Sequence, residues 1–144
     1  MFSISMLDYF FTYPEWGPFI LRVALGAAFI AHGYPKLFKM YAGVAGWFDS
    51  IGIRPGRFWA LAVGVVEFFG GITLVLGIFT QLAAGLIAVV MLVAMVKVKW
   101  GKAAYVESER MGWELDLIYF AAALALVFLG PGAYALGSAF YFGY

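Results

Sequence analysis

Apolar residues fill four long blocks of the chain, and shorter polar stretches separate them. The blocks cover about residues 17–38, 58–79, 81–98 and 113–130. A transmembrane helix needs roughly 20 mostly apolar residues, so each block is about long enough to cross a bilayer. The apolar positions surround each predicted helix, as is typical of helices that face lipid and one another. The pattern predicts an all-α polytopic membrane protein, with residues 1–144 forming one four-transmembrane-helix bundle.

The stretches between the blocks predict two kinds of connection. Residues 77–81, GIFTQ, leave room only for a tight turn, so the second and third spans should form an antiparallel hairpin. The first loop, residues 39–57, is longer and mixes bulky apolar residues with glycines. We predict that this loop is an interfacial segment lying on the membrane, with a short helix broken at Gly52 and Pro55.

The composition agrees with a membrane protein and excludes several other classes. Hydrophobic residues make up 65% of the chain and charged residues 12%, whereas a soluble domain is about half apolar and about a quarter charged. Too few polar residues remain to cover a water-soluble surface. The net charge is +1 without a basic block, so no nucleic-acid partner is expected. The absence of cysteine excludes thiolate metal sites and cysteine nucleophiles within this chain.

Basic residues predict the orientation of the spans. Eight of the nine lie in or beside the first and third loops: Lys36, Lys39, Arg54, Arg57, Lys97, Lys99, Lys102 and Arg110. Only Arg22 lies elsewhere. The positive-inside rule therefore predicts a multi-pass protein of the plasma membrane, with both long loops in the cytoplasm and both termini outside.

Ionisable side chains interrupt the apolar blocks. Arg22, His32 and Lys36 lie in the first block, and Glu67 lies almost at the centre of the second. A charge at the membrane centre is costly unless it is paired or hydrated. Glu67 has no short route to water, which favours a functional or partner-binding role over a protonated structural one. Lys36 fits an anchor or salt bridge as well as it fits a functional role. His32 fits a structural hydrogen bond as well as it fits a contact to a proton or ligand.

One face of the first predicted helix has charged residues at its ends and glycines between them. At about 100° per residue, it holds Arg22, Gly26, Phe29, Gly33 and Lys36, with His32 beside it. Gly64, Glu67 and Gly71 share a face of the second helix. Because small residues let helices approach closely in a membrane, we predict that these two faces pack together.

This packing predicts ionic partners. Glu67 would lie between His32 on the inner side and Arg22 on the outer side. Lys36 would meet Glu114 or Asp116, which begin the fourth span near its inner end.

Four segments resemble the DoxX family of membrane proteins. They are LRVALGAAFIAHGYPKLF (residues 21–38), GWFDSIGIRP (46–55), VEFFGGITLVLGIFTQLAA (66–84) and ELDLIYFAAALALVFLGPGAYALG (114–137). The family's His-Gly pair, lysine, mid-helix glutamate and last-helix acid look like His32, Gly33, Lys36, Glu67 and Glu114. The resemblance implies a four-helix membrane protein. Some members are described as subunits of a thiosulfate:quinone oxidoreductase, and others are linked to membrane redox or oxidative-stress complexes.

A quinone-linked redox subunit is the first functional hypothesis. Glu67 and His32 are the catalytic candidates, since Glu67 would pass protons and His32 would donate to a quinone carbonyl. The cofactor-binding candidates are His32, Lys36, Arg22 and Glu114. The cations among them would stabilise negative charge on a reduced ligand. Several aromatic residues would flank the ring or only pack between helices: Phe29, Tyr34, Phe68 and Phe69.

The expected cofactor is a quinone, with no covalently bound group and no metal. One histidine does not provide bis-histidine haem ligation, and no cysteine is present for an iron–sulfur cluster. Electrons would therefore come from partner subunits, which makes the chain a subunit whose status as an enzyme stays open. The alternatives are a non-catalytic assembly subunit of a larger membrane complex, and a small proton-coupled transporter built as a homo-oligomer.

Overall fold

The protein is described by a computed structural model that covers residues 8, 12–102, 105 and 112–138. Its main elements are α2 (Trp16–Phe38), α3 (Tyr41–Ser50), α4 (Gly56–Leu76), α5 (Thr80–Val93), the π-helix η1 (Ala94–Lys99) and α6 (Trp113–Leu129). All regular structure in these residues is helical, as predicted. The chain termini and Arg110, used in predicting the orientation, lie outside the described residues.

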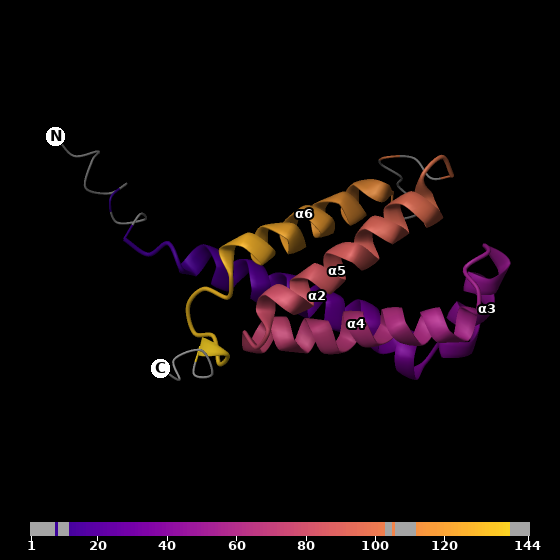
Figure 1. Ribbon diagram of the computed structural model, residues 1–144, viewed down its shortest axis with the longest axis horizontal. Coiled ribbons are helices and arrows are strands. Elements are labelled where there is room, and N and C mark those ends of the chain that lie inside the picture. Colours follow the sequence, from indigo (N-terminus) through magenta and orange to yellow (C-terminus); the bar gives the residue numbers. More distant parts are fainter. Residues whose placement is uncertain (1–7, 9–11, 103–104, 106–111, 139–144) are drawn as a thin grey trace.

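The long helices are arranged as two neighbouring pairs (Figure 1). Helix α2 packs mainly against α4, and α5 packs mainly against α6. The helix α3 lies at one end of the molecule, near the end of α2 and the start of α4 (Figure 1). At the other end, the backbone N–H of Ala133 donates to the carbonyl of Glu15 at 3.1 Å. The first and last described segments therefore meet at the end opposite α3.

Three helical segments are long and apolar enough to cross a membrane: Trp16–Phe38, Gly56–Leu76 and Thr80–Lys99. They correspond to the first three predicted spans. Helix α6 has 17 residues, which at about 1.5 Å per residue makes it roughly 25 Å long. This is somewhat shorter than a typical hydrocarbon core. The first loop contains a helix, α3, that ends before Gly52, as predicted.

The hairpin between the second and third spans is present, but the second helix ends earlier than predicted. Helix α4 stops at Leu76 because Gly77 adopts a left-handed conformation with φ 70°. The N–H groups of Gly77 and Ile78 bond back to carbonyls in the last turn of α4. This glycine-terminated arrangement closes a helix C-terminus without a side-chain clash, and α5 starts three residues later, at Thr80.

Glycines bring α2 and α4 into close contact, which confirms the predicted packing of the two glycine faces. A Cβ added to Gly26 would lie 2.6 Å from the carbonyl oxygen of Gly71, and one added to Gly71 would lie 2.7 Å from that of Gly26. Gly33 faces the backbone of Phe68 in the same way. The crossing requires the absence of side chains at these positions. Helix α2 also continues through Pro35, so Lys36 remains on its helical face.

The core lies where the two helix pairs meet. Its larger buried members are Leu25, Phe29, Leu74, Ile87, Met91 and Leu126. A smaller cluster of Ala45, Phe48 and Ala60 attaches α3 to the start of α4. Phe29 does not sit over a glycine of α4. It is fully buried and packs edge-on against Tyr119 of α6, with ring centroids 5.4 Å apart.

Candidate functional site

A cavity of about 330 Å³ lies between the helix pairs near the α3 end. Helices α2, α3, α4, α5, η1 and α6 all contribute to its wall. Most of the lining is aliphatic or aromatic, and five side chains bring charge or an imidazole: His32, Lys36, Glu67, Lys99 and Asp116. A small-molecule site is typically an apolar hollow with a few placed polar groups, and this cavity has that composition.

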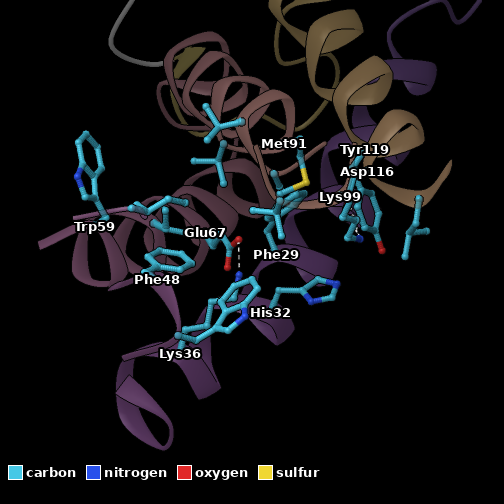
Figure 2. Close-up of a pocket in the computed structure, with 18 residues that line it drawn as sticks. Phe29, His32, Lys36, Phe48, Trp59, Glu67, Met91, Lys99, Asp116 and Tyr119 are labelled. Carbon is cyan, nitrogen blue, oxygen red and sulfur yellow. Dashed lines mark hydrogen bonds and ion pairs between the residues drawn. The ribbon is translucent and has the colours of Figure 1, made fainter. Parts of the chain in front are cut away.

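Glu67 and Lys36 form an ion pair between α4 and α2 (Figure 2). Lys36 Nζ lies 2.7 Å from Glu67 Oε1. Glu67 is only 1% exposed, whereas the Lys36 side chain keeps 29% of its surface accessible. The second carboxylate oxygen, Oε2, is buried and has no hydrogen-bond partner among the described residues. Glu67 thus contributes to the cavity wall, while its Oε2 is a buried acceptor that no described donor satisfies.

Helix geometry explains why Lys36 reaches Glu67. Side chains on an α-helix lean toward the N-terminus of the helix. Helices α2 and α4 run in opposite directions, so Lys36 and Glu67 lean toward each other. Gly64, one turn before Glu67, leaves room for Leu37, the neighbour of Lys36, since a Cβ there would lie 2.7 Å from Leu37 Cδ2.

A second ion pair joins η1 to α6. Lys99 Nζ lies 2.9 Å from Asp116 Oδ2 and 3.1 Å from Oδ1, and it also donates to the carbonyl of Gly112 at 3.4 Å. In Figure 2 this pair lies on one side of Glu67, and Trp59 lies on the other. Lys99 belongs to the π-helical turn that ends the third span. Such turns widen a helix locally and are frequent at functional sites.

His32 lines the cavity on α2, close to aromatic rings. Its ring centroid is 6.2 Å from that of Phe29 and 6.0 Å from that of Tyr119. The described residues give the imidazole no hydrogen-bond partner. Both ring nitrogens therefore remain available to a ligand, one as donor and one as acceptor in the neutral form.

The cavity reaches the protein surface beside two tryptophans. Trp47 of α3 and Trp59 of α4 line the cavity and are 48% and 44% exposed. Phe48, in contrast, lines it from the buried side of α3. Indole rings are favoured at the membrane–water interface, which makes this mouth suitable for an amphipathic ligand.

The comparisons with known proteins identify the family. The DoxX family model matches residues 17–100, which is more than half of the chain. The chain belongs to the DoxX family. The matched region contains His32, Lys36 and Glu67 as well as Lys99.

Two curated relatives are similar over different lengths. An uncharacterized protein of Haemophilus influenzae is 34% identical over 122 residues, which cover 84% of this chain and 88% of the relative. A Bacillus subtilis protein named "Putative oxidoreductase CatD" is 33% identical over 85 residues, which cover 59% of this chain and 61% of that relative. No solved structure gives a significant match.

Arg22 lies outside the cavity of this DoxX-family chain, and the predicted arrangement of Glu67 between His32 and Arg22 is wrong. Arg22 is fully buried at the other end of α2. It donates to five backbone carbonyls, those of Leu74, Val75, Pro131, Ala133 and Tyr134. These carbonyls belong to the last turn of α4 and to the irregular segment after α6. The last carbonyls of a helix lack a full set of helical partners, and a guanidinium at a helix C-terminus also interacts favourably with the helix dipole.

The predicted partner of Lys36 is also wrong. Lys36 pairs with Glu67, and Asp116 pairs with Lys99. Glu114 is not part of the cavity wall, and its Oε2 is buried without a partner among the described residues. The two acids that begin α6 therefore have different surroundings, because residues two positions apart are separated by about 200° around a helix.

Of the four aromatic residues considered for a ligand, only Phe29 lines the cavity. Tyr34 and Phe68 pack with Phe38 on another face of α2 and α4. Phe68 also contacts Phe69, which is 52% exposed. These three residues therefore form an aromatic surface between helices and not a ring-binding wall.

Sequence analysis did not single out Lys99, Trp59 or Tyr119 as site residues. One signal was available for Lys99, since it ends one apolar block while Asp116 begins the next. Charged residues at facing ends of consecutive spans are natural partners. Within the described residues, no group of three or more metal-ligating side chains is placed to hold a metal ion.

Proposed function

We propose that this DoxX-family chain is a membrane subunit that binds a quinone head group in the cavity and takes part in quinone-linked redox chemistry. One observation carries the proposal: an apolar, aromatic-lined cavity has in its wall the Lys36–Glu67 ion pair and His32, whose imidazole has no hydrogen-bond partner among the described residues. Its volume of about 330 Å³ is at the lower end of the range typical of small-molecule sites, about 300–1,000 Å³. That size suits a single ring whose tail leaves through the mouth.

The lining residues have distinct proposed roles. A bound quinone would supply the exchange of two electrons and two protons. Glu67 would pass protons, and His32 would donate to a ring oxygen. The ammonium groups of Lys36 and Lys99 would favour negative charge on the ligand. Arg22 would act only on stability, because its donors are occupied by backbone carbonyls.

The proposed setting is the plasma membrane, with four spans. Helix α6 would be the fourth, despite its shorter length, because it is as apolar as α5 and packs beside it. Helix α3 would lie at the cytoplasmic interface together with both long loops. The B. subtilis relative's name supports an oxidoreductase context. Electrons would come from partner subunits. The alternative is that the partners are further copies of this chain in a homo-oligomer.

A cavity-filling variant tests the proposal. Val63 lines the cavity one helical turn before Glu67, whereas Val65 lies on the same helix outside the cavity and is 40% exposed. We expect decylubiquinone to raise the melting temperature of the wild-type protein and of Val65→Phe in detergent. Val63→Phe should lose this shift.

Lipid extraction gives a second readout. Quinone should co-purify with the wild-type protein and with Val65→Phe but be depleted from Val63→Phe. If the wild-type protein carries no quinone and decylubiquinone does not change its thermal stability, the quinone proposal is rejected. A gentle-detergent pull-down that still recovers a defined complex would then favour the assembly role.

A further inference from the structure

The cavity is polar on one side and apolar on the other. The Lys99–Asp116 pair and His32 lie to one side of Glu67 (Figure 2). Trp59 lies on the opposite side. An amphipathic ligand gains most when its polar head is near the charged groups and its apolar part is near the aromatic wall. The apolar part of such a ligand therefore points toward the start of α4.

Resting on the proposed quinone site, we propose that the apolar tail of the ligand leaves the cavity sideways, between α4 and α5, and that the ligand enters from the bilayer through the same opening. Trp59 of α4 and Val93 of α5 form the two edges of this opening. The ligand class that fits is a molecule dissolved in the membrane, with a small polar head and a long apolar tail.

The cavity face of α4 becomes more exposed toward the start of the helix. Trp59, Val63 and Glu67 line the cavity, and they are spaced about one helical turn apart. Glu67 is buried, Val63 is half-buried and Trp59 is exposed. The cavity therefore extends along about 12 Å of α4, at about 1.5 Å per residue, from the buried ion pair to the surface of the molecule.

The facing side of α5 shows the same change. Met91 is buried, Val90 is half-buried and Val93 is 45% exposed, and all three line the cavity. In contrast, no lining residue from α2 or α6 is exposed. The exposed lining residues are Trp47, Trp59 and Val93, from α3, α4 and α5. This distribution indicates an opening between α4 and α5, with α3 beside it.

The opening has a limit at each end. Toward the hairpin the two helices are in contact, because a Cβ added to Gly70 of α4 would lie 3.4 Å from Cδ1 of Ile87 on α5. Ile87 is fully buried there. Toward the other end, Phe48 of α3 lines the cavity from a buried position. The opening is therefore confined to the part of α4 and α5 between the hairpin contact and α3.

The surface around the opening is apolar. Exposed aliphatic residues follow both helical segments next to it: Leu61, Val65, Val89, Leu92 and Val96. The segments Gly56–Leu76 and Thr80–Lys99 are each long and apolar enough to cross a membrane. An opening between two such segments faces lipid acyl chains, so a tail that leaves the cavity here enters another apolar medium.

Two neighbouring turns of α5 provide matched variants for a test. Val93 lines the cavity, whereas Val89, one turn earlier and also exposed, does not. The probes are decylubiquinone and 2,3-dimethoxy-5,6-dimethyl-1,4-benzoquinone, which has the same ring with a methyl group in place of the tail. Isothermal titration calorimetry in detergent measures the dissociation constant of each probe for the wild-type protein, Val93→Trp and Val89→Trp.

We expect Val93→Trp to weaken the binding of decylubiquinone at least about 10-fold, because the new indole occupies the path of the tail. The binding of the methyl analogue should change by less than about 3-fold, since its ring does not reach the opening. Val89→Trp should leave the binding of both probes within about 3-fold of the wild-type value.

The outcomes separate this inference from the quinone proposal. If Val93→Trp binds decylubiquinone as the wild-type protein does, weakens both probes equally, or differs in no way from Val89→Trp, the tail does not leave between α4 and α5, while the quinone site remains. Binding of neither probe to the wild-type protein would reject the quinone site itself. If Val93→Trp does not fold, Val93→Phe and Val89→Phe provide the same comparison with a smaller ring.

Discussion

Lys36 Nζ lies 2.7 Å from Glu67 Oε1, and this contact joins two helices at residues that are 31 positions apart in the sequence. The pair is unequal, because the carboxylate is buried while the lysine side chain is partly accessible. Lys36 therefore provides a counter-charge to a carboxylate that is shielded from solvent. The same contact leaves Glu67 Oε2 buried without a hydrogen-bond partner among the described residues.

Lys36→Met should destabilise the protein by about 2–3 kcal/mol, because it leaves the carboxylate of Glu67 without a counter-charge. The value is at the lower end for a buried pair, since Lys36 is not fully buried. Thermal unfolding in detergent measures the loss. Lys39→Met is the matched control, because Lys39 is exposed and its ammonium lies 5.6 Å from the centroid of the Tyr34 ring, and its effect should stay below about 1 kcal/mol.

The double variant Lys36→Met with Glu67→Gln tests the origin of that loss. Removing both charges should recover at least about half of the stability lost in Lys36→Met, since no uncompensated charge remains. Strict additivity of the two single effects would show that the ion pair does not couple α2 to α4.

Arg22→Lys should loosen the segment after α6. Lysine keeps the charge, but it does not reproduce five hydrogen bonds to carbonyls spread over two segments. We expect a loss of about 3 kcal/mol or more, since several bonds to a charged donor disappear. Hydrogen exchange of the Leu136 and Gly137 amides, which bond to Leu76 and Gly77, should accelerate.

The control for Arg22 is Arg57→Lys, since Arg57 is exposed at the start of α4. It should leave both stability and exchange near the wild-type values. Quinone-dependent stabilisation should persist in Arg22→Lys, because Arg22 does not line the cavity. Loss of ligand binding without a change in exchange would contradict the structural role.

The sequence was sufficient to predict the helical segments and the contact between α2 and α4. Hydrophobic length determines where spans lie, and the glycine spacing on each helix determines which faces approach. The prediction that Glu67 is buried in this contact follows from the same two patterns. These are local properties, and they need no knowledge of how helices tilt.

Ionic partners were harder to predict because they depend on side-chain direction and on irregular backbone. A position counted along a straight helix does not include the lean of the Lys36 side chain toward the N-terminus of α2. The acceptors of Arg22 are carbonyls, including three in residues 131–134, which carry no side-chain signal in the sequence. Lys99 reaches the cavity from a π-helical turn that a regular helical pattern does not reveal.

Gly26→Ala should test the close crossing of α2 and α4. The new Cβ would lie 2.6 Å from the Gly71 carbonyl oxygen, so the helices must separate. We expect a destabilisation of about 1–3 kcal/mol, as is typical of overpacking. Gly17→Ala is the control on the same helix, because nothing lies within 4 Å of its added Cβ, and thermal unfolding should show little change there.

The absence of cysteine makes the predicted orientation directly testable with single cysteines. Gly17 starts α2 and Gly43 lies in α3, and neither position has atoms within 4 Å of an added Cβ. A membrane-impermeant maleimide added to intact cells should label Gly17→Cys but label Gly43→Cys only after the cells are opened. The reverse pattern would place α3 and the cavity mouth on the outer surface, and ligand entry would then occur from the outer leaflet.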